Sequence, residues 1–516
     1  MNEKKRFAIN AFAQIFSFVV SLGITFFLTP YIVSNLGTAA YGFVGLAQNF
    51  VSYVQLITIA LNSMAGRFIS ISYHQGNIEQ AKKYFTSVFY SNVILLSFVA
   101  LCACFVIYRL EHLIIIPSSL LFDVKLLFIC VFANFIISVL FNIFSVSTFI
   151  CNRLELASMR SISANVIKAL TLIITFHFFS PAVWFVGLAT FIASIYTVTT
   201  NIRLRNYLTP ILVIQKKYFD LKKVKELVSA GIWNVVSRLN AILGAGLDLL
   251  IANLFIGATP MGILSIIKRL PVLTLSFYEN INSIFAPRWT KLYAQNKHTQ
   301  LKKDISRAIR FFGVISFIPL AAIFAYSDWF YTLWLPSQNA QKFYLLTILA
   351  AMDLPFAMPL QPIYNIYPMT NKIRANSLFG LGMHLCVFLC IIIGVNVFDD
   401  TMTHLMIIAG TRASFNIIKA LTFLPLYGSH CIKMPARILY KNTFRSVFSF
   451  GFLLSILLEI KSLFISITWL HLAFGLGFSF LLGSIIGYFI VLNQEDRLLL
   501  KDSFTKILQK ITRIFK

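Results

Sequence analysis

The residues best suited to chemistry in this chain are ionisable side chains inside long apolar segments. We place six basic and three acidic residues at bilayer depth, which gives this interior a net charge of about +3. A charge at the centre of a bilayer costs about 2.5–3.5 kcal/mol on insertion scales, so each one needs a partner or a function. The basic residues are Lys168, Arg238, Lys268, Arg269, Arg412 and Lys419, and the acidic ones are Asp248, Glu279 and Asp353. The basic surplus favours the binding of an anionic group such as a diphosphate.

Depth along the predicted helices indicates which charges meet. Asp248 stands about eight residues, and Lys268 about seven, from the outer ends of consecutive segments, so at about 1.5 Å per residue they share a level. Arg238 and Glu279 share a level nearer the inside. These pairs are either structural ion pairs, which we favour, or gates that exchange partners.

The segment around residues 401–427 contains two basic residues and no acid of its own. Arg412 and Lys419 are seven residues apart, which places them on one helix face. Asp353, two segments earlier, is a candidate partner for Arg412. The pairings neutralise three basic groups and leave two of Arg269, Arg412 and Lys419 in surplus. Because Arg412 and Lys419 share a face, they are the leading candidates for anion binding.

Amide side chains supply most of the polarity of the first half. They are Asn10, Gln14, Gln48, Asn49, Gln55, Asn62, Asn134 and Asn142. Such groups suit sugar hydroxyls, but they also hold helices together in lipid, and for any single residue we favour the second role.

Composition indicates an integral membrane protein. The chain is 58% hydrophobic and 12% charged, with a mean hydropathy of +0.80, and a soluble domain would not expose that much apolar surface. Its net charge of +26 would suggest a nucleic-acid partner in a soluble protein. The distribution of the basic residues explains that charge better, and no nucleic-acid partner is expected.

Apolar runs predict an all-α fold with about fourteen transmembrane helices. The runs are 8–33, 40–65, 84–108, 121–150, 161–179, 182–201, 229–256, 261–286, 308–326, 343–367, 373–397, 401–427, 442–465 and 467–492. With the N-terminus inside, nearly all Lys and Arg of the loops fall on the inner side, as the positive-inside rule requires. We therefore expect a multi-pass protein with both termini in the cytoplasm.

Two stretches carry the same landmarks about 220 residues apart. Gly37 and Gly42 recur as Gly257 and Gly262. The series continues with Arg67, Gln80-Ala81-Lys82-Lys83 and Asn152-Arg153-Leu154, which recur as Arg288, Gln300-Leu301-Lys302-Lys303 and Asn371-Lys372-Ile373. A repeat of this length, built from membrane helices, is typical of a duplicated transporter rather than a solenoid.

Each repeat holds six spans, so the two lobes insert with the same orientation as a parallel repeat. The predicted parts are an N-terminal lobe 1–201, a cytoplasmic linker 202–228, a C-terminal lobe 229–427, two further helices in 428–493 and a basic amphipathic cytoplasmic tail 494–516. The longest hydrophilic segments are far below the roughly 50 residues of a minimal domain. A pump with its own ATPase domain is therefore excluded.

No motif indicates an enzyme or a cofactor. The chain has no GxxxxGK[ST] loop, and its seven cysteines form no zinc-type or redox arrangement. A membrane-embedded glycan polymerase or ligase stays open as an alternative, although such an enzyme is expected to present a larger outer loop than 327–342. We expect no enzymatic activity, metal or cofactor.

The layout resembles the Wzx-type flippases, which export polysaccharide repeat units and belong to the superfamily that includes multidrug exporters and lipid II flippases. The residues that carry the resemblance are Asn10, Gln14, Pro30, Leu36-Gly37, Gly42, Asp248, Ile256-Gly257, Gly262 and Pro287-Arg288. The resemblance implies alternating access in the bacterial cytoplasmic (inner) membrane. Its implied cargo is an undecaprenyl-diphosphate-linked oligosaccharide for O-antigen, capsule or another surface polysaccharide.

The basic interior would then hold the diphosphate, and Arg67 and Arg288 would lie at the inner mouth, although topology alone also explains that pair. Possible partners are a polysaccharide polymerase, chain-length machinery and a coupling ion, either a proton or sodium. The main alternative is a multidrug or metabolite antiporter of the same fold. A cationic drug would prefer an acidic cavity, which argues against that alternative.

Overall fold

A computed structural model describes residues 3–501 except 152, 284, 371 and 465. Every regular element in this part of the chain is helical, which confirms the all-α prediction. The chain divides into two compact units, Met1–Ser265 and Ile266–Lys516, and each is described by itself. The six-helix lobe boundaries stay a prediction, and residues 502–516 of the predicted tail lie outside the described residues.

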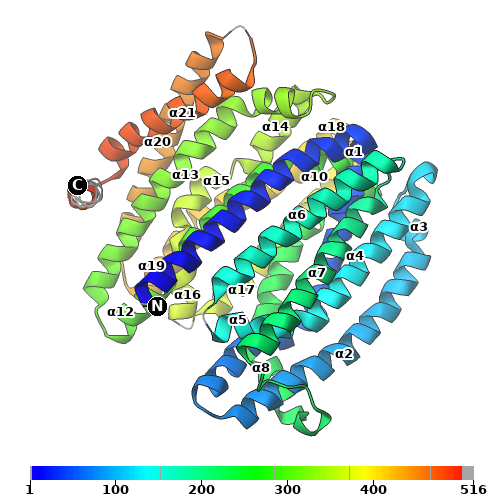
Figure 1. Cartoon of the computed structure of the whole chain (residues 1–516). Helices are drawn as coiled ribbons and strands as arrows, with labels where there is room; N and C mark the ends of the chain where they lie inside the picture. The colour runs from blue at the N-terminus through cyan, green and yellow to red at the C-terminus, as the bar shows by residue number, and fades with distance from the viewer. Residues whose placement is uncertain (1–2, 152, 284, 371, 465, 502–516) are drawn as a thin grey trace, which may run out of the picture. The chain divides into compact units, whose positions relative to one another are not determined.

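The first unit is built of long helices with short interruptions (Figure 1). Helices α4 and α7 pack along each other, and α1 packs on α2, α6 and α8. The elements are α1 (Glu3–His74), α2 (Ile78–Tyr108), α3 (Leu110–Leu113), η1 (Ser118–Leu120), α4 (Leu121–Phe141), η2 (Asn142–Ser145), α5 (Val146–Ile150), α6 (Leu154–Phe178), α7 (Trp184–Leu208), η3 (Lys216–Tyr218), α8 (Leu221–Ala241), η4 (Ile242–Gly246), α9 (Asp248–Phe255) and α10 (Ala258–Ile267), whose last two residues belong to the second unit.

The second unit is organised around α13, which packs along α20 and α21 (Figure 1). The elements are α11 (Arg269–Ser283), α12 (Ala286–Ala294), α13 (His298–Trp334), α14 (Ala340–Ala351), α15 (Leu354–Ala357), η5 (Met358–Asn365), α16 (Ile366–Met369), α17 (Ile373–Val397), α18 (Thr401–Leu421), α19 (Phe423–Ile432), α20 (Ala436–Ser462), α21 (Trp469–Ile486) and η6 (Gly487–Val491). A short helical segment, 494–501, follows.

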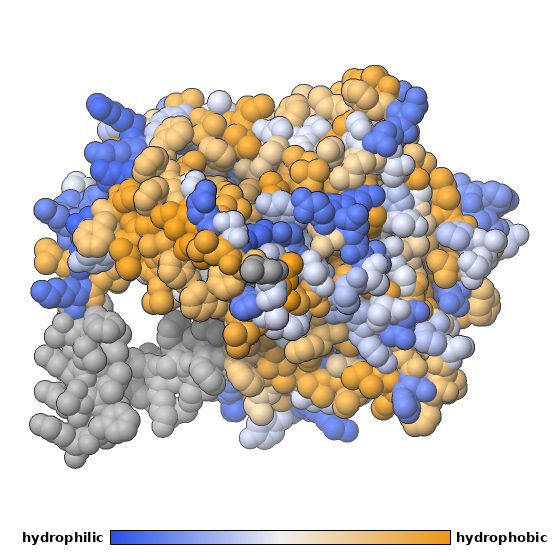
Figure 2. Space-filling view, turned by 90° about the horizontal axis from the view of Figure 1, so that it is seen from above, coloured by the Kyte–Doolittle hydropathy of each residue, from blue (hydrophilic) through white to orange (hydrophobic). Residues whose placement is uncertain are grey.

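Thirteen described helical stretches are long and apolar enough to cross a membrane. The first of them, Val19–His74, has 56 residues, about 84 Å at 1.5 Å per residue, and so is long enough for two crossings of a bilayer core of about 30 Å. Its helix is interrupted at Gly37, whose φ of 80° is open to glycine. Helix α1 as a whole, Glu3–His74, therefore contains the first two predicted spans. Figure 2 shows that apolar side chains cover much of the face in view, with hydrophilic ones among them.

The backbone repeats its local geometry at the predicted offset. Gly37 and Gly257 both have positive φ, and so do Gly76 and Asn296, 220 residues apart. The Asn77 amide donates to the Ser72 carbonyl, and 220 residues later Lys297 donates to Leu292. The Arg153 amide donates to Thr148 and Lys372 donates to Tyr367, at an offset of 219. These matched turns confirm the internal repeat.

The repeated glycines allow close helix crossings inside the first unit. A Cβ on Gly42 would lie 2.8 Å from the Cα of Gly262, and a Cβ on Gly262 would lie 2.0 Å from the carbonyl oxygen of Thr38. A Cβ on Gly231 would lie 1.9 Å from the oxygen of Ala60. Small residues permit such backbone contact between membrane helices. The predicted glycine landmarks therefore have a packing role.

Candidate functional site

Helix α18 carries the basic face that the sequence predicts. Because the chain is helical from Thr401 to Leu421, Arg412, Asn416 and Lys419 lie at i, i+4 and i+7 on one face. Both basic side chains are half-buried. The Lys419 ammonium lies 5.6 Å from the centroid of the Tyr364 ring, a cation–π contact that lets the charge stay within the unit.

Asp353, the acid that the sequence suggests as a partner for this face, accepts a hydrogen bond from an amide side chain. Asp353 lies between α14 and α15 and is 7% exposed. Its Oδ2 accepts a hydrogen bond from Asn416 Nδ2 at 3.0 Å, one helical turn after Arg412. The predicted pairing of Asp353 with Arg412 stays a prediction. Asn416 itself carried no signal in the sequence beyond its spacing from the two basic residues.

The span opposite α18 is interrupted where these contacts occur. The chain passes from α14 through α15 into the 3₁₀ segment η5 and then α16, with Pro355, Pro359 and Pro362 in the interruption. Proline removes a backbone donor and clashes with the preceding turn, so a regular helix cannot continue through these positions. Broken spans are the usual place for binding sites in transporters.

An amide cluster holds this interruption against α11. Asn282 donates from Nδ2 to the carbonyl oxygen of Gln361 at 3.0 Å. Asn365 donates from Nδ2 to the carbonyl oxygen and to Oδ1 of Asn282, at 2.9 Å each. The η5 segment that carries Tyr364 is thus fixed beneath Lys419 by hydrogen bonds.

A second interruption lies in the first unit, in the span that contains Asp248. There α8 passes into a π-helical turn, η4, before α9 begins at Asp248. The carbonyl oxygen of Gly246 accepts hydrogen bonds from Asn49 Nδ2 at 2.9 Å and from the Tyr53 hydroxyl at 2.6 Å. Asp248 is 3% exposed. Single π turns are frequent at functional sites. No sequence pattern predicted this one.

The remaining predicted residues are distributed over both units. Lys168 on α6 and Arg238 on α8 are half-buried in the first unit. In the second unit, Lys268 and Arg269 are half-buried at the junction of α10 and α11, and Glu279 is exposed on α11. The pairs Asp248–Lys268 and Arg238–Glu279 each have one member in either unit, so both stay predictions.

The two arginines expected at the inner mouth are exposed. Arg67 lies on α1 and Arg288 on α12. Arg288 Nη2 makes an ion pair with Asp304 Oδ2 at 2.7 Å, which gives this arginine a structural partner.

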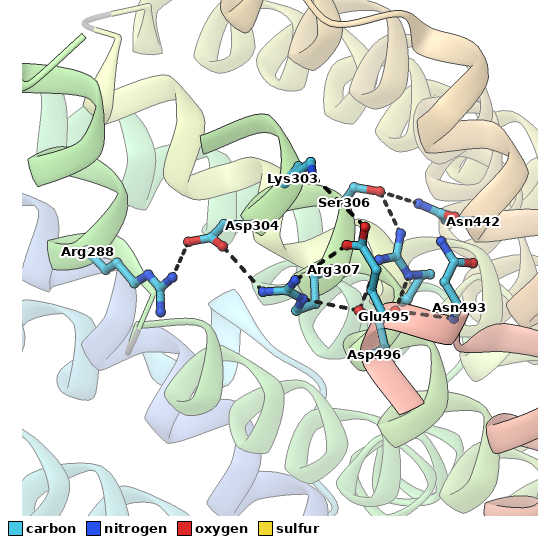
Figure 3. A network of polar contacts seen from close by, with 10 residues as sticks. Arg288, Lys303, Asp304, Ser306, Arg307, Asn442, Asn493, Glu495 and Asp496 are labelled. Atoms are coloured by element: carbon cyan, nitrogen blue, oxygen red, sulfur yellow. Dashed lines mark hydrogen bonds and ion pairs between the residues drawn. The ribbon is translucent and has the colours of Figure 1, made fainter. Parts of the chain in front are cut away.

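One buried charge cluster was missed by sequence reasoning. Arg310, on α13, donates to Asp496 from Nε at 2.5 Å and from Nη2 at 3.2 Å, and Arg307 donates to the same carboxylate at 3.1 Å (Figure 3). Arg310 also donates to Ser306, which accepts a second hydrogen bond from Asn442. The available signal was an arginine inside the apolar run 308–326 and an acidic pair just after the last span.

The Asp496 carboxylate is ionised in this cluster. Burial raises the pKa of Asp496. The hydrogen bonds from Arg310 and Arg307 and the positive charge of Arg310 together lower it by more than burial raises it, so the pKa lies below the ordinary value. The cluster joins the segment after the last span to α13 inside the second unit. It is a structural feature rather than an anion site, because its basic groups already hold an acid.

Comparisons with known proteins agree with the fold. The chain is 27% identical over 502 residues to the uncharacterized membrane protein EpsK of Bacillus subtilis (strain 168), covering 97% of this chain and 98% of that protein. The fold of this chain is similar to that of the lipid II flippase MurJ in an inward closed conformation, with a TM-score of 0.64 and 14% identity; the match covers 93% of this chain and 99% of that one. It is also similar to an inward-facing multidrug resistance MATE family transporter of the MOP superfamily, with a TM-score of 0.62, 16% identity, and coverage of 81% and 94%.

The sequence profile of one family, described as polysaccharide biosynthesis protein, matches residues 7–293, more than half of the chain. That match extends from the first span through the glycine crossing of Gly42 and Gly262 to residue 293, in α12 just after Arg288. The chain belongs to the polysaccharide biosynthesis protein family, and its fold is that of the MOP-superfamily transporters.

Proposed function

We propose that this protein is a flippase that moves undecaprenyl-diphosphate-linked oligosaccharide repeat units from the inner to the outer leaflet of the cytoplasmic membrane. The product would serve surface polysaccharide biosynthesis, as O-antigen, capsule or a related polymer. Membership in the polysaccharide biosynthesis family supports the pathway, and the transporter fold supports translocation rather than glycan synthesis.

The observation that carries the proposal is the basic face of α18. A diphosphate that leaves the headgroup region must exchange its water for strong hydrogen-bond donors. The planar guanidinium of Arg412 offers a fork that matches two phosphate oxygens, and the Lys419 ammonium adds a point charge. The Lys419 ammonium lies over the ring of Tyr364, which is neutral. This contact leaves the positive charge of Lys419 uncompensated by Tyr364, so that charge can attract a phosphate.

Conformational change is proposed to follow from the broken spans. The η4 turn in the first unit and the proline-containing η5 segment in the second are local departures from regular helix. Lys168, Arg238, Lys268 and Arg269 would supply further positive charge along the path, and Asp248 and Glu279 would act as structural or gating partners. A proton or sodium gradient, or consumption of the glycan by a polymerase on the far side, would drive the cycle without a cofactor.

The proposal is tested by complementing a deletion strain with variants of the full chain. Arg412→Ala and Lys419→Ala should insert normally but trap the lipid-linked repeat unit, and Lys419→Arg should restore part of the activity. Arg437→Ala is the matched control, because Arg437 is an exposed basic residue at the start of α20. The measurements are the polyprenyl-diphosphate glycan pool by mass spectrometry and the amount of surface polymer.

Three outcomes discriminate between the alternatives. Wild-type surface polymer in both alanine variants would contradict the anion site. An unchanged pool in the deletion strain, together with altered drug susceptibility, would favour an antiporter. Abnormal chain length without trapped repeat units would favour a polymerase or ligase.

A further inference from the structure

A cavity of about 240 Å³ opens in the first unit, where α1 faces the interruption between α4 and α5. Its polar lining comprises Asn62 and Ser63 from α1 and Asn142 and Ser145 from η2. None of these four residues belongs to the charged site described above. The cavity therefore needs its own explanation.

The polar contacts at the equivalent position of the second repeat differ from those at this cavity. Asn282 is the counterpart of Asn62 at the offset of 220, and both face the interrupted span of their own unit. In the second unit the amide of Asn365 donates hydrogen bonds to Asn282. The residue equivalent to Asn365, at the offset of 219, is Val146, which cannot make those bonds. Asn62 instead exchanges two hydrogen bonds of 2.9 Å with Asn92, away from η2.

Side-chain size differs in the same direction. Ser145 in the first unit corresponds to Tyr364 in the second, and Asn142 corresponds to Gln361, each at the offset of 219. At both positions the side chain in the first unit is the smaller one. The first repeat thus has smaller side chains at positions where the second repeat has a tyrosine and a glutamine.

The cavity presents hydrogen-bond donors that the described residues do not use. The side chain of Asn142 accepts from Ser145, but within the described part of the chain no hydrogen bond uses its Nδ2 group. The Ser63 hydroxyl accepts from Asn234 and donates to no described residue. Each group can therefore pair with a hydroxyl of a ligand.

The rest of the lining is apolar. Ile143 and Val146 are buried beneath the polar groups, and the ring of Phe149 is exposed beside them. A mixture of amides, hydroxyls and one accessible aromatic ring suits a sugar, which has hydroxyls at its edge and an apolar face of C–H groups. None of the described residues that line the cavity is charged, which argues against a phosphate.

We propose that this cavity is a saccharide subsite that receives one sugar ring of the cargo. The inference rests on the proposed function, because the ligand is the glycan of the lipid-linked substrate. The cavity holds the volume of about eight water molecules at about 30 Å³ each. It is below the roughly 300–1,000 Å³ of drug-sized pockets, and is therefore matched to a single ring.

Position 66 allows both a substitution that fills the cavity and a matched control. Gly66 lines the cavity from α1, and a Cβ there would meet Val146 Cγ2 at 3.8 Å, an ordinary contact. Gly66→Ala should therefore fold normally, and a helical alanine is favoured over glycine. Gly66→Phe would fill the space, and Asn142→Ala would remove donors without adding bulk.

The experiment measures binding to the purified full chain in nanodiscs. The probes are the lipid-linked repeat unit recovered from a deletion strain and undecaprenyl diphosphate without sugar. We expect Gly66→Phe to weaken binding of the glycosylated probe about tenfold or more, because overpacking is costly, and Asn142→Ala to weaken it about threefold to tenfold. Binding of undecaprenyl diphosphate should stay within about twofold in every variant, because its phosphates bind elsewhere.

Each other outcome overturns the subsite. Unchanged binding of the glycosylated probe to both variants would show that no sugar occupies the cavity. Equal weakening of both probes would assign the cavity to the lipid chain or to protein structure. If the wild-type chain bound neither probe, the proposed function would fail together with the subsite, whereas binding of both with equal affinity would overturn the subsite alone.

Discussion

Replacing Asp496 by alanine should destabilise the protein far more than any substitution at the neighbouring Glu495. The Asp496 side chain is 5% exposed, and that of its main partner Arg310 is 8% exposed. Removing the carboxylate would leave the Arg310 guanidinium buried without its acid. The Glu495 side chain is 66% exposed, and its ion pairs with Lys303 and Arg307 are 4.0 and 3.9 Å long.

The expected magnitudes follow from these exposures. Breaking a buried ion pair by removing one partner costs about 3–5 kcal/mol. An exposed pair contributes about 0–1 kcal/mol. Asp496→Ala should therefore reduce the free energy of unfolding by about 2–5 kcal/mol more than Glu495→Ala.

The assay is unfolding of the purified chain in detergent, followed by helical circular dichroism as temperature or denaturing detergent increases. A combined Arg310→Met and Asp496→Leu variant should recover most of the loss, because well-packed apolar residues can replace a buried pair. Equal stability of Asp496→Ala and Glu495→Ala would refute the reasoning, and so would a combined variant as unstable as Asp496→Ala.

The pH dependence has a definite sign. The pKa of Asp496 is lower in the folded protein, so its ion pair stabilises fully above the ordinary carboxyl pKa of about 3.9 and is lost as the pH falls through the folded value. The stability difference between wild type and Asp496→Ala should be constant from about pH 8 to 5 and should shrink only below about pH 4. A difference that already shrank between pH 7 and 6 would contradict an ionised Asp496.

Three further predictions concern other contacts. Gly262→Ala should cost about 1–3 kcal/mol, since its Cβ would lie 2.0 Å from the Thr38 carbonyl, whereas Gly382→Ala, which meets nothing within 4 Å, should be neutral; equal unfolding curves would contradict the glycine crossing. Asn253→Ala should cost about 2 kcal/mol or more, because the buried Asn253 side chain bonds both backbone groups of Ile115, while the exposed Asn396→Ala should cost little, and thermal unfolding of the two variants compares them. Tyr364→Phe should preserve glycan export and Tyr364→Leu should reduce it, because the cation–π contact with Lys419 contributes about 0.5–2 kcal/mol; equal surface polymer in both would exclude that role.

The sequence predicted the features that depend on local pattern. Apolar length identified the spans, and repeated glycines identified the duplication, because Gly37 and Gly257 occupy backbone conformations with positive φ that favour glycine. Helical spacing placed Arg412 and Lys419 on one face of α18. Each of these inferences needs only one segment at a time.

Contacts between segments were harder to predict. The sequence suggested Arg412 as a partner of Asp353, and that pairing stays a prediction. The hydrogen bond from Asn416 to Asp353 Oδ2 depends on the rotation of α18, which depth along a helix does not specify. Arg310 lies at the edge of an apolar run, and its partner Asp496 is 186 residues away, beyond the last span. The π turn at Ile242–Gly246 depends on Asn49 and Tyr53, which no local pattern links to it.

The central claim is that the chain moves a complete lipid-linked repeat unit across the membrane. The most direct measurement is the polyprenyl-diphosphate glycan pool of a clean deletion strain, extracted, weighed by mass spectrometry and assigned to a leaflet by its accessibility to an impermeant oxidant. If the protein is this flippase, one complete repeat unit should accumulate on the inner leaflet and surface polymer should be lost. An unchanged pool with intact surface polymer would contradict it.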